Sequence, residues 1–193
     1  RLMLPATFCH LKGLPGGGEG KLGESGILTW AHYAQCPASP LSLKKDEQIR
    51  AQLEASQRAL AELNAAYFLE RLPATAFPRI YPHFKGRIAY LDIETTGLEA
   101  DSEITTIALY DGAAVQTFVK GVNLDEFAEA IGTFALVVTY NGARFDLPFI
   151  RRECGVPMDM AHLDIMFTLR SQGFSGGLKL CERLMGIRRQ VPE

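Results

Sequence analysis

One segment of the chain reads Tyr90-Leu91-Asp92-Ile93-Glu94-Thr95-Thr96-Gly97-Leu98, which places two carboxylates inside an apolar, strand-like run that ends at a glycine. Because side chains two residues apart on a strand point to the same face, Asp92 and Glu94 are expected to stand side by side. Two adjacent anions repel each other and are costly to desolvate without a counter-ion. Their oxygen atoms favour a hard cation, Mg2+ or Mn2+, over zinc. The alternative is an edge strand whose wet face carries two solvated acids.

A second segment supplies a third carboxylate. The β-branched run Leu136-Val137-Val138-Thr139-Tyr140 predicts a strand, and Asn141-Gly142 predicts a turn after it. Residues 143–150 then lead into a helical pattern with Asp146 near its start, where aspartate is favoured as a helix cap. Asp146 is therefore either an N-cap or a third oxygen ligand close to the ends of two strands.

Both segments resemble the DEDD superfamily of 3'-5' exonucleases, which share the ribonuclease H-like fold. The first family motif, Asp-x-Glu-Thr-Thr-Gly, matches residues 92–97, and the second, Asn-x-x-x-Phe-Asp, matches Asn141, Phe145 and Asp146. The chain is most similar to a bacterial group of predicted ribonuclease H-like exonuclease domains, in which a helical segment precedes a sequence like residues 77–87. The resemblance covers most of the chain.

The resemblance implies a metal-dependent 3'-5' exonuclease that hydrolyses phosphodiester bonds of DNA or RNA at single-stranded 3' ends. Asp92, Glu94 and Asp146 would be its catalytic carboxylates and would hold two Mg2+ or Mn2+ ions in a two-metal mechanism. The residues that would contact the terminal nucleotide are Thr95, Thr96, Gly97, Leu98, Asn141 and Phe145.

The family also carries a fourth carboxylate on its last helix, introduced by a His or Tyr, and no such motif is found before the chain ends at Glu193. The chain is therefore expected to lack that helix and to be weakly active. Asp164, in the sequence His162-Leu163-Asp164, is either a fourth metal ligand or the cap of a helix, and His162 is expected to pack or cap. Two alternatives to an exonuclease are a non-catalytic nucleic-acid-binding module on the same fold and a structure-specific endonuclease.

Composition divides the chain into three regions. Residues 1–36 resemble a degenerate helix-hairpin-helix element through Gly13, Leu22, Gly26 and Ile27, but Pro15 has no N–H to offer a phosphate. Structural packing is therefore the preferred interpretation of that element. Residues 37–76 are expected to form a linker and a long helix from Leu43 to Leu72, and residues 77–193 an α/β domain with a mixed sheet flanked by helices.

Within the last region, a hairpin is expected where two strands flank Asp111-Gly112, and helices and strands then alternate. The expected strands are Ile104–Tyr110, Ala114–Val119, Leu136–Tyr140 and His162–Asp164, and the expected helices are Leu124–Ile131, Leu147–Cys154, Ile165–Arg170 and Leu178–Met185.

The bulk composition is that of a globular protein. The chain has 193 residues, is 47% hydrophobic and carries a net charge of -2, with no apolar run long enough to span a bilayer. Its four cysteines are widely spaced and contain no Cys-x-x-Cys pair, which argues against a zinc knuckle and fits the reduced thiols of a cytoplasmic protein. Residues 91–132 hold nine acids and one base, whereas residues 142–193 hold eight bases and six acids. An acidic pocket beside a basic half suits a phosphodiester enzyme, although two solvated surfaces would give the same count.

Overall fold

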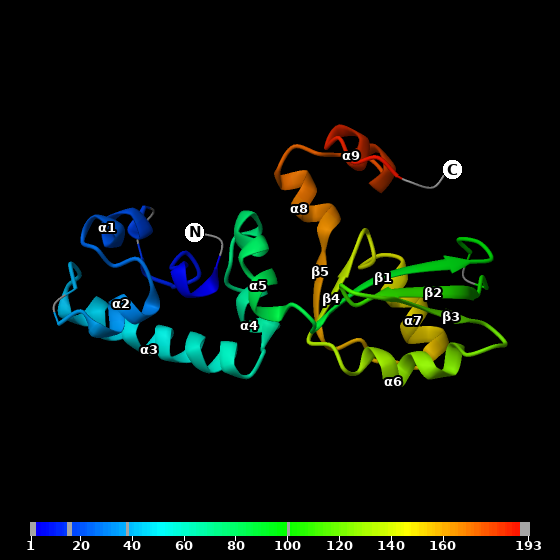
Figure 1. The fold of residues 1–193 in the computed structure, drawn as a ribbon, viewed down its shortest axis with the longest axis horizontal. Coiled ribbons are helices and arrows are strands. Elements are labelled where there is room, and N and C mark those ends of the chain that lie inside the picture. Colours follow the sequence, from blue (N-terminus) through cyan, green and yellow to red (C-terminus); the bar gives the residue numbers. More distant parts are fainter. Residues whose placement is uncertain (1–2, 15–16, 38, 100, 190–193) are drawn as a thin grey trace. The chain divides into compact units, whose positions relative to one another are not determined.

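The structure is a computed structural model that describes residues 3–14, 17–37, 39–99 and 101–189 (Figure 1). It divides into two compact units, an N-terminal unit of residues 1–85 and a sheet unit of residues 86–193. None of the helices in the described part of the chain is both long and apolar enough to cross a membrane.

The N-terminal unit is helical. Its elements are η1 (Leu4–Ala6), α1 (Gly18–Glu24), α2 (Trp30–Gln35), α3 (Leu43–Ala61), α4 (Ala65–Leu69), η2 (Ala74–Arg79) and α5 (Tyr81–Phe84). The prediction of one long helix from Leu43 to Leu72 is wrong, because the chain turns between α3 and α4. Leu63 adopts a left-handed conformation with φ 52°, and the Asn64 side chain then accepts the Tyr67 N–H as the cap of α4.

An aromatic core holds this unit together. The Trp30 and Phe68 rings stack with centroids 6.3 Å apart, and the Trp30 indole N–H donates to the carbonyl of Thr7 at 2.7 Å. Two of the helix-hairpin-helix-like residues, Leu22 and Ile27, are also buried. Packing is thus one role of this segment, while Pro15 lies outside the described residues.

The sheet unit contains five strands in the order β3-β2-β1-β4-β5. The strands are β1 (Ile88–Thr95), β2 (Ile104–Tyr110), β3 (Val115–Val119), β4 (Leu136–Thr139) and β5 (Ala161–Asp164). β1 pairs antiparallel with β2, and β2 antiparallel with β3, whereas β1 with β4 and β4 with β5 are parallel pairs. The predicted strands and the hairpin at Asp111-Gly112 are confirmed. β1 is the central strand, so the alternative that placed its acids on an edge strand is wrong.

The helices of this unit are η3 (Leu124–Glu126), α6 (Phe127–Ile131), α7 (Asp146–Cys154), α8 (Ile165–Ser171) and α9 (Leu178–Leu184). The four predicted helices are confirmed, except that the first turn of the 124–131 segment is a 3-10 helix. Figure 1 shows α6 and α7 on one side of the sheet and α8 and α9 toward the other.

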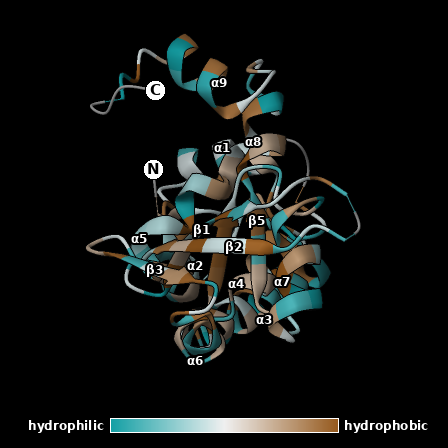
Figure 2. Cartoon of the chain, turned by 90° about the vertical axis from the view of Figure 1, so that its right-hand side faces the viewer, coloured by the Kyte–Doolittle hydropathy of each residue, from teal (hydrophilic) through white to brown (hydrophobic). Residues whose placement is uncertain are grey.

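The hydrophobic core lies on the α6 and α7 side of the sheet. Alternate residues of β1, Leu91 and Ile93, pack there with Phe127 of α6 and Ile150 of α7. Figure 2 shows apolar residues concentrated on the strands, whereas α9 carries both polar and apolar residues. Because one set of β1 side chains is buried in this core, the intervening set, which includes both acids, faces the opposite side.

Candidate active site

Asp92 and Glu94 lie on the central strand and are both exposed, while Leu91 and Ile93 between and beside them are buried. The alternation confirms that the two carboxylates share a face of β1. Across the antiparallel pair, Asp92 lies opposite Ala108 of β2 and Glu94 opposite Thr106.

The turn after β4 brings the third carboxylate toward β1. Asn141 takes a left-handed conformation with φ 63°, which asparagine tolerates better than most residues. At Gly142 any Cβ atom would overlap the Thr139 side chain, so glycine is required there. β4 pairs with β1 only as far as Tyr90, and beyond that point the Asp146 carboxylate accepts the backbone N–H of Ile93.

Asp146 is the first residue of α7 and is only 4% exposed. Its interpretation as an N-cap is wrong, because Phe145 occupies the cap position and no side chain caps this helix. Its carboxylate accepts the backbone N–H of Asp146 itself, at the first position of the helix. The same carboxylate also accepts the Ile93 N–H of the neighbouring strand β1.

The acids influence one another electrostatically. Burial raises the pKa of Asp146 to about 6, and the negative charges of Asp92 and Asp164 add to that rise. Partial burial also raises the pKa of Asp92, with a further contribution from the charge of Glu94, while the positive charge of Arg189 opposes it. Both pKa values are raised because neither water nor nearby positive charge fully offsets the negative charge of these carboxylates.

Asp164 is the N-cap of α8, which was one of the two roles predicted for it from the sequence. One carboxylate oxygen accepts the Asn141 N–H at 2.8 Å and the Met166 N–H at 3.0 Å, and the other accepts the Ala143 N–H at 3.2 Å. These bonds cap α8 and tie the 141–143 turn to the end of β5. Asp164 therefore positions the turn that leads to Asp146.

His162 lies on the edge strand β5 and packs against β4, as expected. Its Nε2 atom lies 2.8 Å from the hydroxyl oxygen of Thr139, which also accepts the Gly142 N–H. Burial lowers the pKa of this imidazole, which favours its neutral form. The ring thus contacts the Thr139 hydroxyl that bonds to the same turn.

The residues expected to contact a nucleotide surround the carboxylates in different ways. The Thr95 hydroxyl donates to the carbonyl of Gly97, which shapes the loop after β1, and Leu98 is 81% exposed at its tip. Thr96 accepts the Glu103 N–H through its hydroxyl. On the other loop, Phe145 packs against Phe149 with centroids 5.0 Å apart, which leaves it only partly available to a ligand.

The three acids offer carboxylate oxygens, which are the ligands that hard divalent cations prefer. No Lys, Arg or His side chain forms an ion pair with Asp146 within the described ranges, although the residue is almost fully buried. A buried carboxylate normally has such a partner. In the same part of the chain, however, no group of three or more His, Cys, Asp or Glu side chains is arranged to hold a metal ion. Asp92 and Glu94 share a face of β1, and the charge of Asp92 reaches Asp146.

Two residues near the site were not predicted from the sequence to have a functional role. Arg189 acts on Asp92 through its charge, and Tyr140 donates a hydrogen bond from its hydroxyl to the carbonyl of Gly176 in the loop before α9. Neither residue belongs to a recognisable motif. Only the position of Tyr140 directly after an apolar strand, beside Asn141, hints that it faces the functional edge of the sheet.

A five-stranded mixed sheet in this order, with helices on its faces, is typical of the ribonuclease H fold. Residues 89–193 match the sequence model of the RNase_H superfamily, and the chain belongs to that superfamily. No curated protein matched the chain. Membership indicates nuclease-type activity on nucleic acid, and the superfamily is typically metal-dependent.

Proposed function

We propose that this chain is a metal-dependent 3'-5' exonuclease in which Asp92, Glu94 and Asp146 hold Mg2+ or Mn2+. The observation that carries the proposal is the Asp146 carboxylate, which is 4% exposed, has a raised pKa and lies within the electrostatic reach of Asp92. A bound cation would offset the burial of this anion and its repulsion by Asp92. Glu94 would complete the donor set by a change of its own side-chain rotamer, since it is exposed on the same face.

A bound divalent cation would supply a Lewis acid at the scissile phosphate and lower the pKa of an attacking water. The chain's own residues would position the substrate around it. The 95–98 loop, shaped by the Thr95 to Gly97 hydrogen bond, would lie against the terminal nucleotide. The Asn141 side chain would approach the sugar and phosphate, because its backbone is already fixed by Asp164. The 3'-5' direction rests on the similarity of both sequence motifs to those of the exonucleases.

The proposal is tested by product analysis. The chain is incubated in Mn2+ with single-stranded DNA and RNA labelled at the 5' end, and the products are separated by length. A ladder that shortens from the 3' end with release of mononucleotides supports the proposal. Internal fragments would indicate an endonuclease, and intact substrate under all conditions would indicate a binding module.

Matched variants locate the activity. Asp92→Asn and Asp146→Asn are expected to reduce turnover by at least about 100-fold, since each removes a charge from a catalytic unit that acts together. Asp125→Asn is the control. Asp125 is an exposed acid of η3, and its substitution removes the same charge elsewhere in the sheet unit. Equal turnover of all three variants would contradict the assignment.

A further inference from the structure

A basic groove lies along α9 and the residues after it. The cavity has a volume of about 250 Å³ and is lined by Lys179, Glu182, Arg183, Ile187, Arg188 and Arg189. Four of these six side chains are cationic and one is a carboxylate. The groove therefore presents mainly positive charge to any ligand that enters it.

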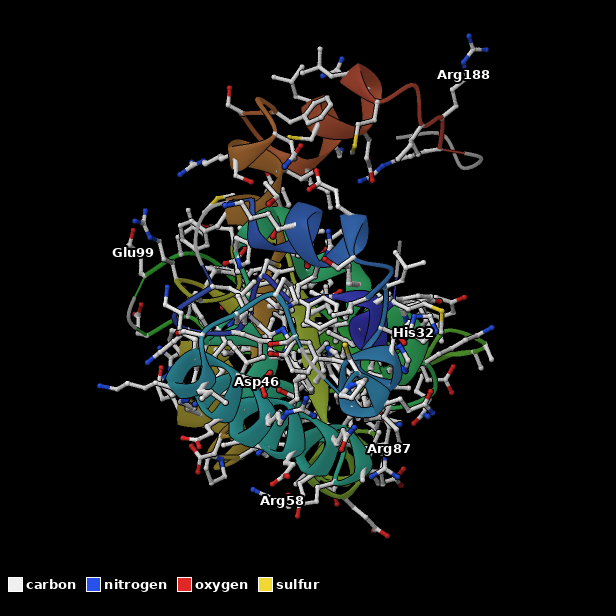
Figure 3. The ribbon with its side chains drawn as sticks, turned by 90° about the vertical axis from the view of Figure 1, so that its left-hand side faces the viewer. His32, Asp46, Arg58, Arg87, Glu99 and Arg188 are labelled. Carbon is white, nitrogen blue, oxygen red and sulfur yellow. The ribbon has the colours of Figure 1, made fainter. Side chains whose placement is uncertain are left out.

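The carboxylate neutralises one of the cations. Arg189 donates from its Nε and Nη2 atoms to the two oxygens of Glu182, at 2.8 and 3.3 Å. Arg183 and Arg188 are both exposed, and Figure 3 shows the Arg188 side chain projecting away from the ribbon. Guanidinium groups in such a setting recognise phosphate oxygens through paired N–H donors.

The groove is anchored at the edge of the sheet where the carboxylates lie. Tyr140, which immediately follows β4, donates its hydroxyl hydrogen bond to the Gly176 carbonyl, and its oxygen lies 3.7 Å from the Cys181 sulfur. Cys181 is fully buried, so α9 is held by packing as well as by this bond. The charge of Arg189 also reaches Asp92 across the same region and opposes the rise of the Asp92 pKa. One cation of the groove therefore lies within electrostatic range of the candidate active site, and Tyr140 ties the loop before α9 to the same edge of the sheet.

We propose that the α9 groove binds the phosphodiester backbone of a nucleic-acid strand whose end lies at Asp92, Glu94 and Asp146. This inference rests on the proposed function, because it assigns the groove to the same substrate. An extended polyanion suits the site better than a single anion, since the cations are distributed along the length of the helix and beyond its end. Contacts of this kind carry no sequence information and weaken as salt displaces them.

The test measures binding without hydrolysis. Fluorescence anisotropy of a labelled single-stranded oligonucleotide is recorded in EDTA over a range of salt concentrations, with the full 193-residue chain. The variant is Arg183→Gln with Arg188→Gln, whose targets are both exposed, and the control is Lys44→Gln with Lys45→Gln on exposed positions of α3. The two double variants change the net charge equally, and thermal melts verify that both remain folded.

The expected results are quantitative. Two lost phosphate contacts should reduce the slope of log Kd against log salt by about 1.4 and weaken binding about 25-fold at about 0.1 M salt, with the difference vanishing near 1 M. The control pair should bind like the wild type. Equal affinity of the two double variants, or no binding by the wild-type chain at low salt, would overturn the proposal. Competition by inorganic phosphate at the same concentration of phosphate groups would also overturn it, because the groove would then hold an isolated anion.

The outcome is separable from that of the proposed function. If the wild type releases mononucleotides in Mn2+ and the Arg183→Gln, Arg188→Gln variant binds the oligonucleotide with unchanged affinity, only the assignment of the groove is refuted. If the variant binds the oligonucleotide more weakly but the wild type never hydrolyses a strand, only the proposed exonuclease activity is refuted.

Discussion

Replacing Asp146 with asparagine is expected to stabilise the sheet unit when no metal ion is bound. Burial raises the pKa of this carboxyl from its ordinary value of 3.8 to about 6. A group with a raised folded-state pKa binds its proton more tightly in the folded than in the unfolded protein. The contribution of Asp146 to the free energy of unfolding is therefore most favourable below the ordinary pKa. It falls as the pH rises from 3.8 to about 6 and is constant above that interval.

The size of the effect follows from the same two pKa values. Each pKa unit corresponds to about 1.4 kcal/mol, so the ionised Asp146 lowers the free energy of unfolding by about 3 kcal/mol near pH 7.5 and by only about 0.5 kcal/mol near pH 4. Asparagine is almost isosteric and neutral, and its amide oxygen can still accept the Ile93 N–H. The variant should therefore gain most of these 3 kcal/mol at neutral pH.

Urea unfolding in EDTA, followed by far-UV circular dichroism at several pH values, measures this gain. The difference between wild type and Asp146→Asn isolates the residue, because every other titrating group is common to both proteins. Asp125→Asn, at an exposed position of η3, is the matched control and should change stability by less than about 0.5 kcal/mol.

Mn2+ should reverse the order of the two proteins. Metal binding stabilises the wild type by mass action and should have little effect on the variant. The reasoning is refuted if Asp146→Asn is less stable than the wild type in EDTA at neutral pH, or if its gain is as large near pH 4 as near pH 7.5.

Three further predictions concern the supports of the fold. Burial lowers the pKa of His10 to about 4 from 6.5, so the N-terminal unit should lose about 3 kcal/mol as the pH falls across that interval; fluorescence of the single tryptophan reports the loss, which His10→Gln should largely remove. Asp164→Ala leaves three backbone N–H donors without an acceptor and should lower the free energy of unfolding of the sheet unit by at least about 3 kcal/mol in urea. Asp164→Asn keeps one acceptor oxygen and should lower it by less. Equal losses in the two variants would contradict the hydrogen-bond argument. Gly142→Ala should cost at least about 2 kcal/mol because its Cβ overlaps Thr139, whereas Gly20→Ala in α1, with no atom nearby, should stabilise by about 0.5–1 kcal/mol in thermal melts.

The local features of the sheet unit could be predicted from the chain alone. The alternation around Asp92 and Glu94 places both acids on one face of a strand, because the side-chain period of a strand is two. The hairpin at Asp111-Gly112 and the cap at Asp164 likewise depend on residues within a few positions of each other. Propensity and periodicity describe such neighbours well.

Predictions failed where distant residues compete with local preference. The pattern from Leu43 to Leu72 is continuously helical, yet the chain breaks at Leu63 so that α4 can bring Phe68 against Trp30. Asp146 has the local signature of an N-cap, but Phe145 occupies that position, and the Asp146 carboxylate also accepts the Ile93 N–H of another strand. In both cases tertiary packing overrides the local preference.

The amino-acid sequence by itself determined the order of the elements, the shared face of the two β1 acids and the turn at Asn141-Gly142, since each depends on short-range geometry. Only the tertiary structure decided that Asp146 is buried beside β1, that Asp164 is occupied by three backbone donors, and that Arg189 acts on Asp92. Burial and electrostatic reach depend on which distant segments pack together. A carboxylate's pKa, and with it its capacity to hold a cation, is therefore a property of the folded sheet and not of the motif that contains it.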